Sequence, residues 1–337
     1  MNRGIIGSIV CAAVASFAGH AIAQDLSQLR GNIRVDGSST VFPITEAVAE
    51  QFSKESPNVR VTVGVSGTGG GFKRFAAKEI DISDASRPIK SSEMKLMTEN
   101  KVDFIELPIA YDGLTVVVNP DNDWADSLTV DELKKIFLAD SAAKNWSDVR
   151  DGWPERPIMI FSPGTDSGTF DYFKEVIAGK KGSIRSDMSV SEDDNVLVNG
   201  VSGQKDAIGF FGCAYYMENK DKLRAVPIVN PVTKKPVMAT TENIESGTYA
   251  PFSRPLFIYI NARSARKPEV RQFVEYYLRE CPKLVGDVGY VKLPDSMYER
   301  SKTNFASRKM GTQFHDDQGE KIHGALTKVY QNRPNLD

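Results

Sequence analysis

Strand-like and helix-like segments alternate along this sequence, and this alternation limits the folds open to the chain more than any other feature. Ile33 and Val35 have the spacing of a strand, and the apolar residues of segment 41–52 then fall on one face of a helix. In segment 59–65 every second residue is valine, as in a second strand, and another short helical segment follows around Phe72. Repeated strand–helix units predict an α/β fold with mixed, mostly parallel sheets flanked by helices.

The length of the chain allows more than one compact unit. Its 337 residues are 41% hydrophobic and 26% charged, which is ordinary for a globular protein. A chain of this length can form two medium-sized lobes around separate cores.

The first residues have the features of a secretory signal. Arg3 precedes an apolar stretch from Ile5 to about Ala18, and residues 21–23 (Ala-Ile-Ala) fit the small-x-small rule for cleavage. A membrane anchor is the alternative, but Gly7 and other small or polar residues interrupt the stretch, which is shorter than the roughly 20 apolar residues of a membrane span. We expect residues 1–23 to be a cleaved signal peptide and the protein to be exported.

The charge of the chain disfavours nucleic acid as a partner. The formal net charge is −2, and loss of residues 1–23 would remove one basic residue and no acidic one, leaving about −3. A broad basic surface of the kind that binds nucleic acid is therefore not expected. An anionic ligand would have to be held by local dipoles or by a single arginine.

Cysteine and histidine give little support for catalysis or metal binding. Cys213 and Cys281 could form one disulfide or stay as buried thiols, and their spacing does not decide between the two. His315 and His323 lie in a polar C-terminal segment, where exposed positions are expected, and no zinc spacing is present. We therefore expect no metal and no cofactor.

Two enzyme motifs fail in detail. Residues 71–74 (Gly-Phe-Lys-Arg) break the Gly-Lys-Ser/Thr that a P-loop requires, and residues 64–68 lack the last glycine of a Gly-x-Ser-x-Gly hydrolase motif. Acidic residues are scattered rather than clustered, although a carboxylate-based phosphatase stays open as an alternative. The sequence favours a binding protein over an enzyme.

Three predicted strand-to-helix turns are rich in glycine and hydroxyl groups: residues 36–40, 66–69 and 166–169. The first N–H groups of a helix have no internal acceptor, and the helix dipole adds positive potential there, so such turns can bind a small oxyanion. For any one of these turns taken alone, ordinary N-capping is the better explanation. Three in one α/β chain favour a ligand site, because the carboxyl ends of strands are where ligands bind in such sheets.

A fourth segment, residues 84–88 (Asp-Ala-Ser-Arg-Pro), follows a predicted short strand. Arg87 could donate two hydrogen bonds to a tetrahedral oxyanion with a geometry that lysine cannot match. A surface arginine in a loop is the alternative, and the pattern alone does not decide.

Taken in order, these motifs resemble the periplasmic phosphate-binding proteins of ABC-type phosphate importers, over essentially the whole chain after residue 23. The segments that carry the resemblance are 36–40 (DGSST), 63–71 (VGVSGTGGG), 81–88 (DISDASRP), 136–138 (IFL) with Asn145 and Trp146, 166–169 (DSGT) and 208–212 (IGFFG).

The resemblance implies a two-lobed periplasmic binding protein fold with two hinge strands, near residues 111–118 and 252–260. Residues 24–110 and 253–337 would form one lobe, and residues 111–252 the other. It further implies a monomer in the periplasm that binds inorganic phosphate, delivers it to a membrane permease and catalyses no reaction.

The resemblance also implies which residues bind the phosphate. They are Ser39 and Thr40 of the first turn, Ser66 of the second, and Ser167, Gly168 and Thr169 of the other lobe. Some members of the family have an arginine before the last turn and an aspartate after the second helix, where this chain has Pro163 and Ser86. Arg87 would then replace that arginine from the opposite lobe.

The acceptor of the phosphate proton stays open between two carboxylates. Monohydrogen phosphate can donate its proton to a buried carboxylate, which repels fully ionised sulfate. Asp166 is the first candidate and Asp84 the second, while Asp166 could equally serve as an N-cap of its own helix. If neither carboxylate affects selectivity, a site for another tetrahedral oxyanion such as sulfate is the better interpretation.

Overall fold

The computed structural model describes residues 26–140, 143–165, 167–179, 182–191, 193–316, 322 and 325–330. Asp166 and His323 lie outside these residues, as do residues 1–25.

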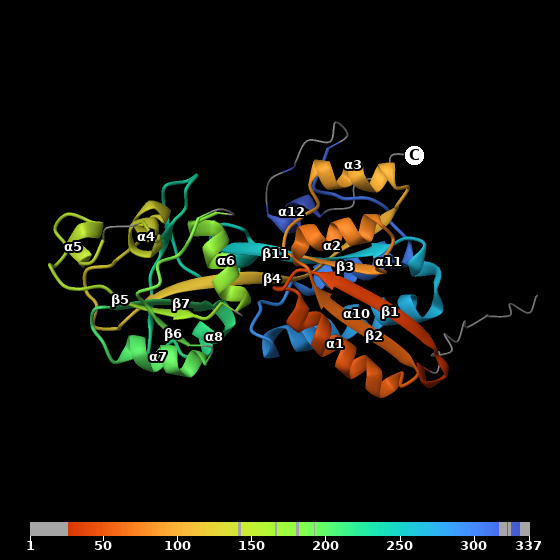
Figure 1. Ribbon diagram of the computed structural model, residues 1–337, viewed down its shortest axis with the longest axis horizontal. Coiled ribbons are helices and arrows are strands. Elements are labelled where there is room, and N and C mark those ends of the chain that lie inside the picture. Colours follow the sequence, from red (N-terminus) through yellow and green to blue (C-terminus); the bar gives the residue numbers. More distant parts are fainter. Residues whose placement is uncertain are drawn as a thin grey trace, which may run out of the picture.

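Two lobes lie side by side in the structure, joined by long strands (Figure 1). The first lobe, on the right of Figure 1, begins with strand–helix units as the sequence predicts. Its elements are η1 (Leu26–Gln28), β1 (Gly31–Gly37), α1 (Phe42–Glu55), β2 (Val59–Val65), α2 (Gly67–Ala76), β3 (Ile82–Ala85) and α3 (Ser91–Glu99). β1 lies parallel to both β2 and β3, so the three strands end at the same edge of the sheet.

The second lobe follows a long strand, β4 (Phe104–Val118). Its helices are α4 (Val130–Phe137), α5 (Trp146–Val149), α6 (Gly168–Ile177), α7 (Asp194–Ser202), α8 (Cys213–Glu218) and α9 (Thr241–Glu245). Its strands are β5 (Met159–Pro163), β6 (Ser189–Ser191), β7 (Ala207–Gly212), β8 (Arg224–Ala225), β9 (Ile228–Val229) and β10 (Pro236–Val237). Helix α4 begins with a capping box, since Thr129 Oγ1 accepts a hydrogen bond of 3.1 Å from Glu132 N and the Glu132 carboxylate accepts one from Thr129 N.

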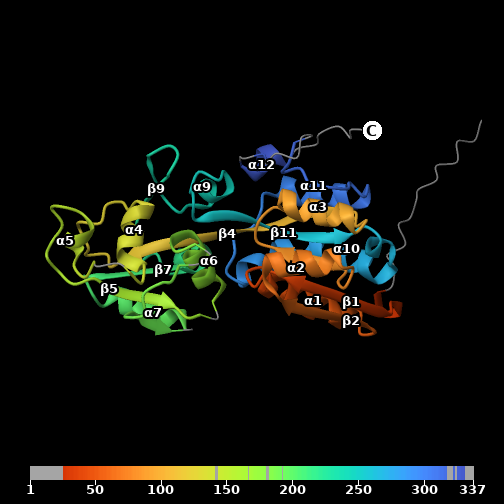
Figure 2. The ribbon, with the colours of Figure 1, turned by 45° about the horizontal axis from the view of Figure 1, so that its top comes forward.

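The chain then returns to the first lobe through β11 (Ser253–Asn261). The remaining elements are η2 (Ser264–Arg266), α10 (Pro268–Asp287), α11 (Asp295–Ala306) and α12 (Leu326–Val329). Figure 2 shows β4 and β11 extending between the two lobes.

One sheet runs through both lobes, in the order β2-β1-β3-β11-β4-β7-β5-β6, with β8 paired to β4. Four of its described strand pairs are parallel and four antiparallel, because β4 and β11 cross the middle in opposite directions. Residues 104–113 of β4 pair with β11, and residues 114–118 pair with β7. The same strand therefore belongs to the first lobe at its start and to the second lobe at its end.

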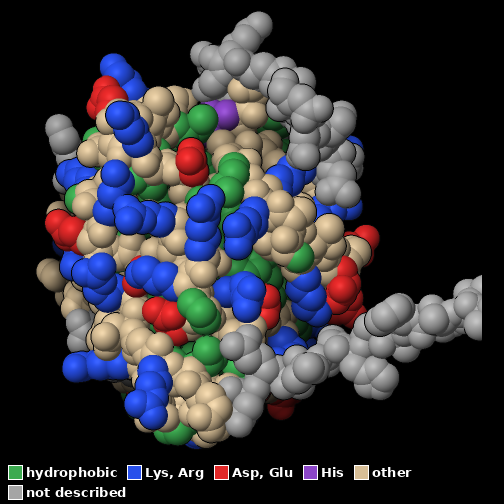
Figure 3. Space-filling view, turned by 90° about the vertical axis from the view of Figure 1, so that its right-hand side faces the viewer, with side chains coloured by type: hydrophobic (Ala, Val, Ile, Leu, Met, Phe, Trp, Pro, Cys, Tyr) green, Lys and Arg blue, Asp and Glu red, His purple; other side chains and the backbone are tan. Residues whose placement is uncertain are grey.

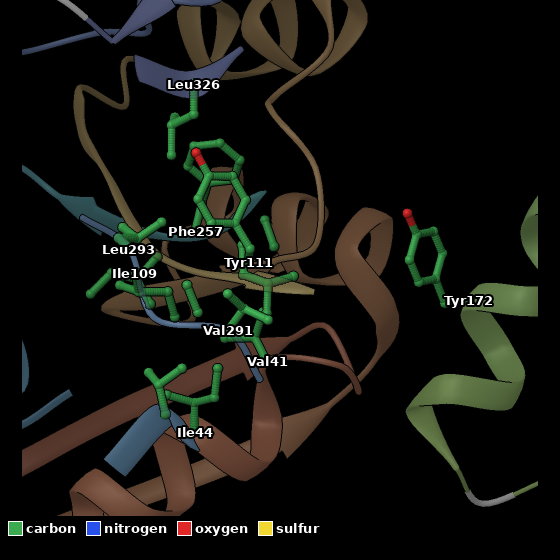
Figure 4. Packing of buried hydrophobic residues seen from close by; sticks show 14 of the residues in the cluster. Val41, Ile44, Ile109, Tyr111, Tyr172, Phe257, Val291, Leu293 and Leu326 are labelled. Carbon is green, nitrogen blue, oxygen red and sulfur yellow. The ribbon is translucent and has the colours of Figure 1, made fainter. Parts of the chain in front are cut away.

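The apolar core is continuous from lobe to lobe. Figure 4 shows Val41 and Ile44 at the start of α1, Ile109 and Tyr111 on β4, and Tyr172 on α6 of the second lobe. All fifteen residues of β4 are buried, and most of them are apolar.

Two questions left by the sequence are answered by the fold. Cys213 and Cys281 are both buried and free, so they do not form a disulfide. His315 is buried with 6% of its surface exposed, so the expected exposed position is wrong for this residue. The segment around it packs against β4, where Gln313 N donates a hydrogen bond to Glu106.

Candidate functional site

The turns after β1, β2 and β3 meet at one edge of the sheet. Ser38 N donates a hydrogen bond of 3.0 Å to the Asp84 carbonyl, and Ser66 N donates one of 3.1 Å to the Gly37 carbonyl. Gly37 has a φ of +145°, and a Cβ at this position would lie 2.2 Å from the Asp84 carbonyl oxygen. Only glycine allows this close approach of two backbone segments, so the first turn depends on it.

Helix α6 of the second lobe faces these turns. Ser39 Oγ lies 3.5 Å from Asp171 Oδ2, and a Cβ on Gly168 would lie 3.5 Å from Thr40 Cα. Between the lobes is a cleft of about 340 Å³, whose lining comes from both of them. The lining residues are Ser38, Ser39, Thr40, Gly67, Thr68, Gly69, Ser86, Arg87, Asp171, Lys174, Glu175, Gly179 and Arg254.

Arg254 lies in this cleft and was not among the residues that the sequence predicted. Its guanidinium donates to Thr40 Oγ1, to Asp112 Oδ2 and to Glu175 Oε2, each at 3.1 Å. It also stacks on the Tyr172 ring, with 3.7 Å between Cζ and the ring centroid. Arg254, which lies on β11, thus contacts the first lobe, the second lobe and the other strand that crosses between them, β4.

The environment of Arg254 keeps it charged. Only 14% of the side chain is exposed, and burial by itself lowers the pKa of a guanidinium. Asp112, Tyr172 and Glu175 more than reverse this effect, so the pKa of Arg254 is raised above its ordinary value. A buried cation that stays charged is suited to hold an anion.

Arg87 also lines the cleft, and like Arg254 it is already bound by a carboxylate. Its two terminal nitrogens donate to Glu93 at 2.8 and 2.7 Å, and its guanidinium lies 5.7 Å from the centroid of the Phe72 ring. The pair fixes the orientation of Arg87 and neutralises part of its charge. An anion in the cleft would therefore gain less from Arg87 than from an unpaired arginine.

Ser66 is not among the residues that line the cleft. Its hydroxyl donates to Asp36, which also forms an ion pair with Arg74. Gly67, in the left-handed region with a φ of +72°, and Thr68 line the cleft from this turn instead. The Thr68 hydroxyl lies 3.1 Å from the Ser86 hydroxyl, so the second and fourth segments are joined there.

The residues at the start of α6 lie next to the first turn but do not line the cleft. Ser167 Oγ accepts a hydrogen bond of 3.4 Å from Phe170 N, which is an N-cap. Gly168 is adjacent to Thr40, and a Cβ on Gly212 would lie 3.8 Å from Thr169 Oγ1. Helix α6 instead lines the cleft through Asp171, Lys174 and Glu175.

Asp84 lies behind the cleft and not in it. Its side chain is fully buried, and neither carboxylate oxygen has a hydrogen-bond partner among the described residues. Burial raises the pKa of Asp84 to about 8, the nearby Thr45 hydroxyl opposes this shift, and the Asp36 carboxylate adds to it. Asp84 is therefore mostly protonated at neutral pH and is a poor proton acceptor.

Asp171 and Glu175 are the carboxylates that line the cleft. The sequence offers little sign of this role for Asp171, because an acidic residue in the first turn of a helix is common for dipole reasons alone. A signal for Arg254 was present, since an arginine in an otherwise apolar predicted hinge strand requires a buried partner. Within the described ranges, no group of three or more His, Cys, Asp or Glu side chains could hold a metal ion.

Comparison with known proteins places the chain in a family. Residues 23–280 match a family model described as a PBP superfamily domain. Protein SphX of Synechococcus elongatus is 51% identical over 293 residues, covering 86% of each chain. The phosphate-binding protein PstS of Staphylococcus haemolyticus is 40% identical over 272 residues, covering 80% of this chain and 84% of its own.

A solved structure is similar to this chain in both sequence and fold. The crystal structure of a possible phosphate binding protein from Planctomyces limnophilus superposes with a TM-score of 0.81 and is 49% identical, covering 83% of this chain and 99% of that one. The chain belongs to the periplasmic binding protein superfamily and, within it, to the family of the phosphate-binding substrate-binding proteins of ABC-type importers.

Proposed function

We propose that this protein binds inorganic phosphate between its two lobes and delivers it to the membrane permease of an ABC-type importer. The observation that carries the proposal is the composition of the cleft. The starts of α1 and α2, the hydroxyls of Ser39, Thr40 and Thr68, and the Arg254 guanidinium converge on one small volume. Helix N-termini, hydroxyl donors and a buried arginine are together the groups that hold a dehydrated oxyanion.

Arg254 would couple the anion to closure of the lobes. It lies on β11, which crosses between the lobes, and it already contacts Thr40 on one side and Glu175 on the other. A phosphate in the cleft would take up donors that now go to these two side chains. The anion would then bridge Arg254 and the two lobes in place of these direct contacts, and in this way stabilise the arrangement in which the lobes lie together around it.

The remaining predicted ligands keep their place in the proposal. Ser66, Ser167, Gly168 and Thr169 are included because the resemblance implies them, and Arg87 because it lines the cleft. Asp166 is included as a candidate acceptor of the phosphate proton. A rotation of the second lobe about β4 and β11 would bring the start of α6 toward the anion. Residues 24–110 with 253–337 and residues 111–252 would be the two lobes that move.

For selectivity we assign the proton-accepting role to Asp171, which lines the cleft and lies 3.5 Å from Ser39 Oγ. A carboxylate at this position can accept the proton of monohydrogen phosphate and repels sulfate, which has none. Asp166 is the second candidate. No bond of the ligand is made or broken, so the protein acts as a carrier and not as an enzyme.

The relatives support export as well. As a member of this family the chain would function in the periplasm, as a monomer, after removal of residues 1–23. In the part of the chain that the structure describes, no helix has the length and apolar character required to cross a membrane.

Equilibrium dialysis with labelled phosphate, in the presence and absence of excess sulfate, tests the proposal. The wild type should retain phosphate when sulfate is in excess, and Asp171→Asn should bind phosphate more weakly and discriminate less. Glu175→Gln serves as the matched control on the same helix and should keep the discrimination. Absence of phosphate binding by the wild type contradicts the function, whereas full discrimination by Asp171→Asn contradicts only the role of Asp171 and directs attention to Asp166.

A further inference from the structure

The end of the first lobe that points away from the cleft is rich in basic side chains. Figure 3 views this end directly and shows Lys and Arg spread across it. The N-terminal ends of β1, β2 and β3 lie here, together with the start of β4 and the end of β11, because these strands reach the cleft or the second lobe at their other ends. We call this end the distal face and define it by Lys78, Lys101, Arg263, Arg266, Lys267, Arg308 and Lys309.

Hydrogen bonds show that these residues belong to one face. Ser264 Oγ and Lys267 Nζ both donate to Asp81, at 2.7 and 2.8 Å, which ties the turn after β11 to the start of β3. Gly311 N donates a hydrogen bond of 2.9 Å to the Phe104 carbonyl, which joins the segment after α11 to the start of β4. All seven side chains are exposed except Lys309, which is half-buried.

Acidic residues offset only part of this charge. Asp81 is buried beneath Lys267, and Glu79 forms an ion pair with Arg74. Glu99 and Asp103 are exposed at the same end. The protein as a whole is slightly acidic, so the excess of basic side chains on this face is a local feature.

Three of the basic residues occupy backbone positions that favour glycine. Lys78, Lys101 and Arg308 follow the ends of α2, α3 and α11 with φ angles of 61°, 54° and 54°. All three helices end in the same C-terminal motif, in which the N–H of this basic residue and the N–H of the next residue both donate to carbonyls of the helix. The acceptors are the carbonyls of Phe75 and Arg74 in α2, of Thr98 and Met97 in α3, and of Phe305 and Asn304 in α11.

The choice of a cation at these three positions is not explained by helix stability. A basic residue near a helix C-terminus does interact favourably with the helix dipole, but any position in the last turn gives that benefit without a left-handed backbone. Glycine is the residue that this backbone conformation favours. Three helices that end on one face, each with a cation in place of glycine, indicate that the charges serve something outside the fold.

We propose that the distal face binds the anionic phospholipid headgroups of a membrane. Basic side chains spread over three helix ends and a turn match a diffuse anionic surface, which attracts each Lys or Arg independently. Met310, 47% exposed beside Lys309, adds an apolar side chain among the cations, as in surfaces that lie at a membrane interface.

Co-sedimentation with vesicles tests the proposal. Purified protein is mixed at low salt with vesicles of phosphatidylcholine alone or of phosphatidylcholine with phosphatidylglycerol. The variant K78G/K101G/R308G places the conformationally favoured residue at all three helix ends while removing three charges. Since each basic side chain near an anionic surface contributes roughly a factor of five in binding, this variant should bind the anionic vesicles about a hundredfold more weakly.

A matched variant removes the same charge from the second lobe. Lys234 is exposed and has a φ of 58°, and Lys220 and Lys222 are exposed nearby in the sequence, so K220Q/K222Q/K234G should bind anionic vesicles like the wild type. Phosphate affinity, measured on all three proteins, should be the same. Equal binding of the wild type to neutral and anionic vesicles overturns the proposal, as does equal loss in the two variants. Binding that requires the permease in the vesicle and not the anionic lipid would show that the distal face recognises a protein instead.

Discussion

The two ends of the first lobe are built from the same strands but differ in the burial and pairing of their basic side chains. At the cleft, Arg87 and Arg254 are largely buried, and each is bound by carboxylates at 2.7 to 3.1 Å. At the distal face, Lys78, Lys101 and Arg308 are exposed at helix ends, in a backbone conformation that favours glycine.

The difference follows from the solvent around each group. A buried cation requires a carboxylate or an anionic ligand, because water no longer stabilises its charge. An exposed cation requires no partner, contributes little to stability and remains available to bind another surface. Substitution of Arg254, the more deeply buried of the two arginines, should therefore change both stability and ligand binding, and substitutions at the distal face should change neither of them much.

Arg254→Ala should have the largest effect. The substitution removes the charged donor of the cleft and leaves Asp112 buried without its cation. We expect phosphate affinity to fall by roughly a thousandfold, as for loss of several charge-assisted hydrogen bonds. Stability should fall by about 3–5 kcal/mol, the usual effect of breaking a buried ion pair. Calorimetry and urea denaturation measure the two quantities.

A second substitution separates the two effects. In the double variant R254A/D112N the uncompensated buried charge is gone, so part of the lost stability should return while phosphate binding stays weak. Recovery of affinity along with stability would mean that Arg254 supports the fold and does not contact the ligand.

Asp84→Asn should change how stability depends on pH. The pKa of Asp84 is about 8 in the folded protein, well above the value of about 3.9 in an unfolded chain. The folded state therefore holds this proton more tightly, and the contribution of Asp84 to stability decreases as pH rises from about 4 to 8. An asparagine does not titrate, so the Asn variant does not lose stability as the pH rises. It should be more stable than the wild type by a few kcal/mol at pH 9.

Asp81 provides the matched control for Asp84. Burial raises the pKa of Asp81, but hydrogen bonds from Lys267, Ser264 and Arg34 N outweigh it, so the pKa of Asp81 is lowered. Its contribution to stability is present above the unfolded value and is lost as the solution becomes acidic. Asp81→Asn should therefore destabilise the protein at neutral pH. Urea denaturation across the pH range would contradict this account if the two variants shifted stability in the same direction at pH 9.

Arg87→Ala should weaken phosphate binding by about tenfold, because Glu93 already neutralises part of its charge. Thermal stability should be nearly unchanged, since the side chain lies in a loop at the edge of the cleft. Glu93→Gln sharpens the test: it frees the guanidinium, and phosphate affinity measured by calorimetry should increase. Unaltered affinity in both variants removes Arg87 from the site.

The smallest effect is expected at the distal face. Lys101→Gly replaces a left-handed lysine, which relieves about 1 kcal/mol of backbone energy and loses up to about 1 kcal/mol of favourable interaction with the helix dipole. The change in unfolding free energy should thus stay within about 1 kcal/mol in either direction. A loss of several kcal/mol in chemical denaturation would show that the charge is part of the fold.

The strand–helix order and the capped turns could be predicted because they are local. Val59 to Val65 alternate, Thr129 and Glu132 form a capping box, and Gly37 marks a turn that admits no side chain, and each of these patterns is visible within a few residues. The middle of the sheet is different. Its antiparallel pairs join residues far apart in the sequence, such as Ser253 and Gly113, so they leave no local pattern.

The same distinction applies to the site. Ser39 and Thr40 could be found because a hydroxyl-rich turn is a local pattern, and both line the cleft. Arg254 contacts Thr40, Asp112 and Glu175, which are 214, 142 and 79 residues away in the sequence. A partner set of this kind appears only when the chain is folded. The role of Asp84 could not be judged either, because burial and not spacing determines its protonation.

The central claim is that the cleft binds phosphate through Arg254 and selects it over sulfate. Calorimetric titration of the ligand-free protein with phosphate and then with sulfate, near pH 8 and beside Arg254→Ala, tests it most directly. The account predicts tight one-to-one binding of phosphate, no response to sulfate and loss of the phosphate signal in the variant. Binding of sulfate in place of phosphate, or phosphate binding that persists unchanged in Arg254→Ala, would contradict it.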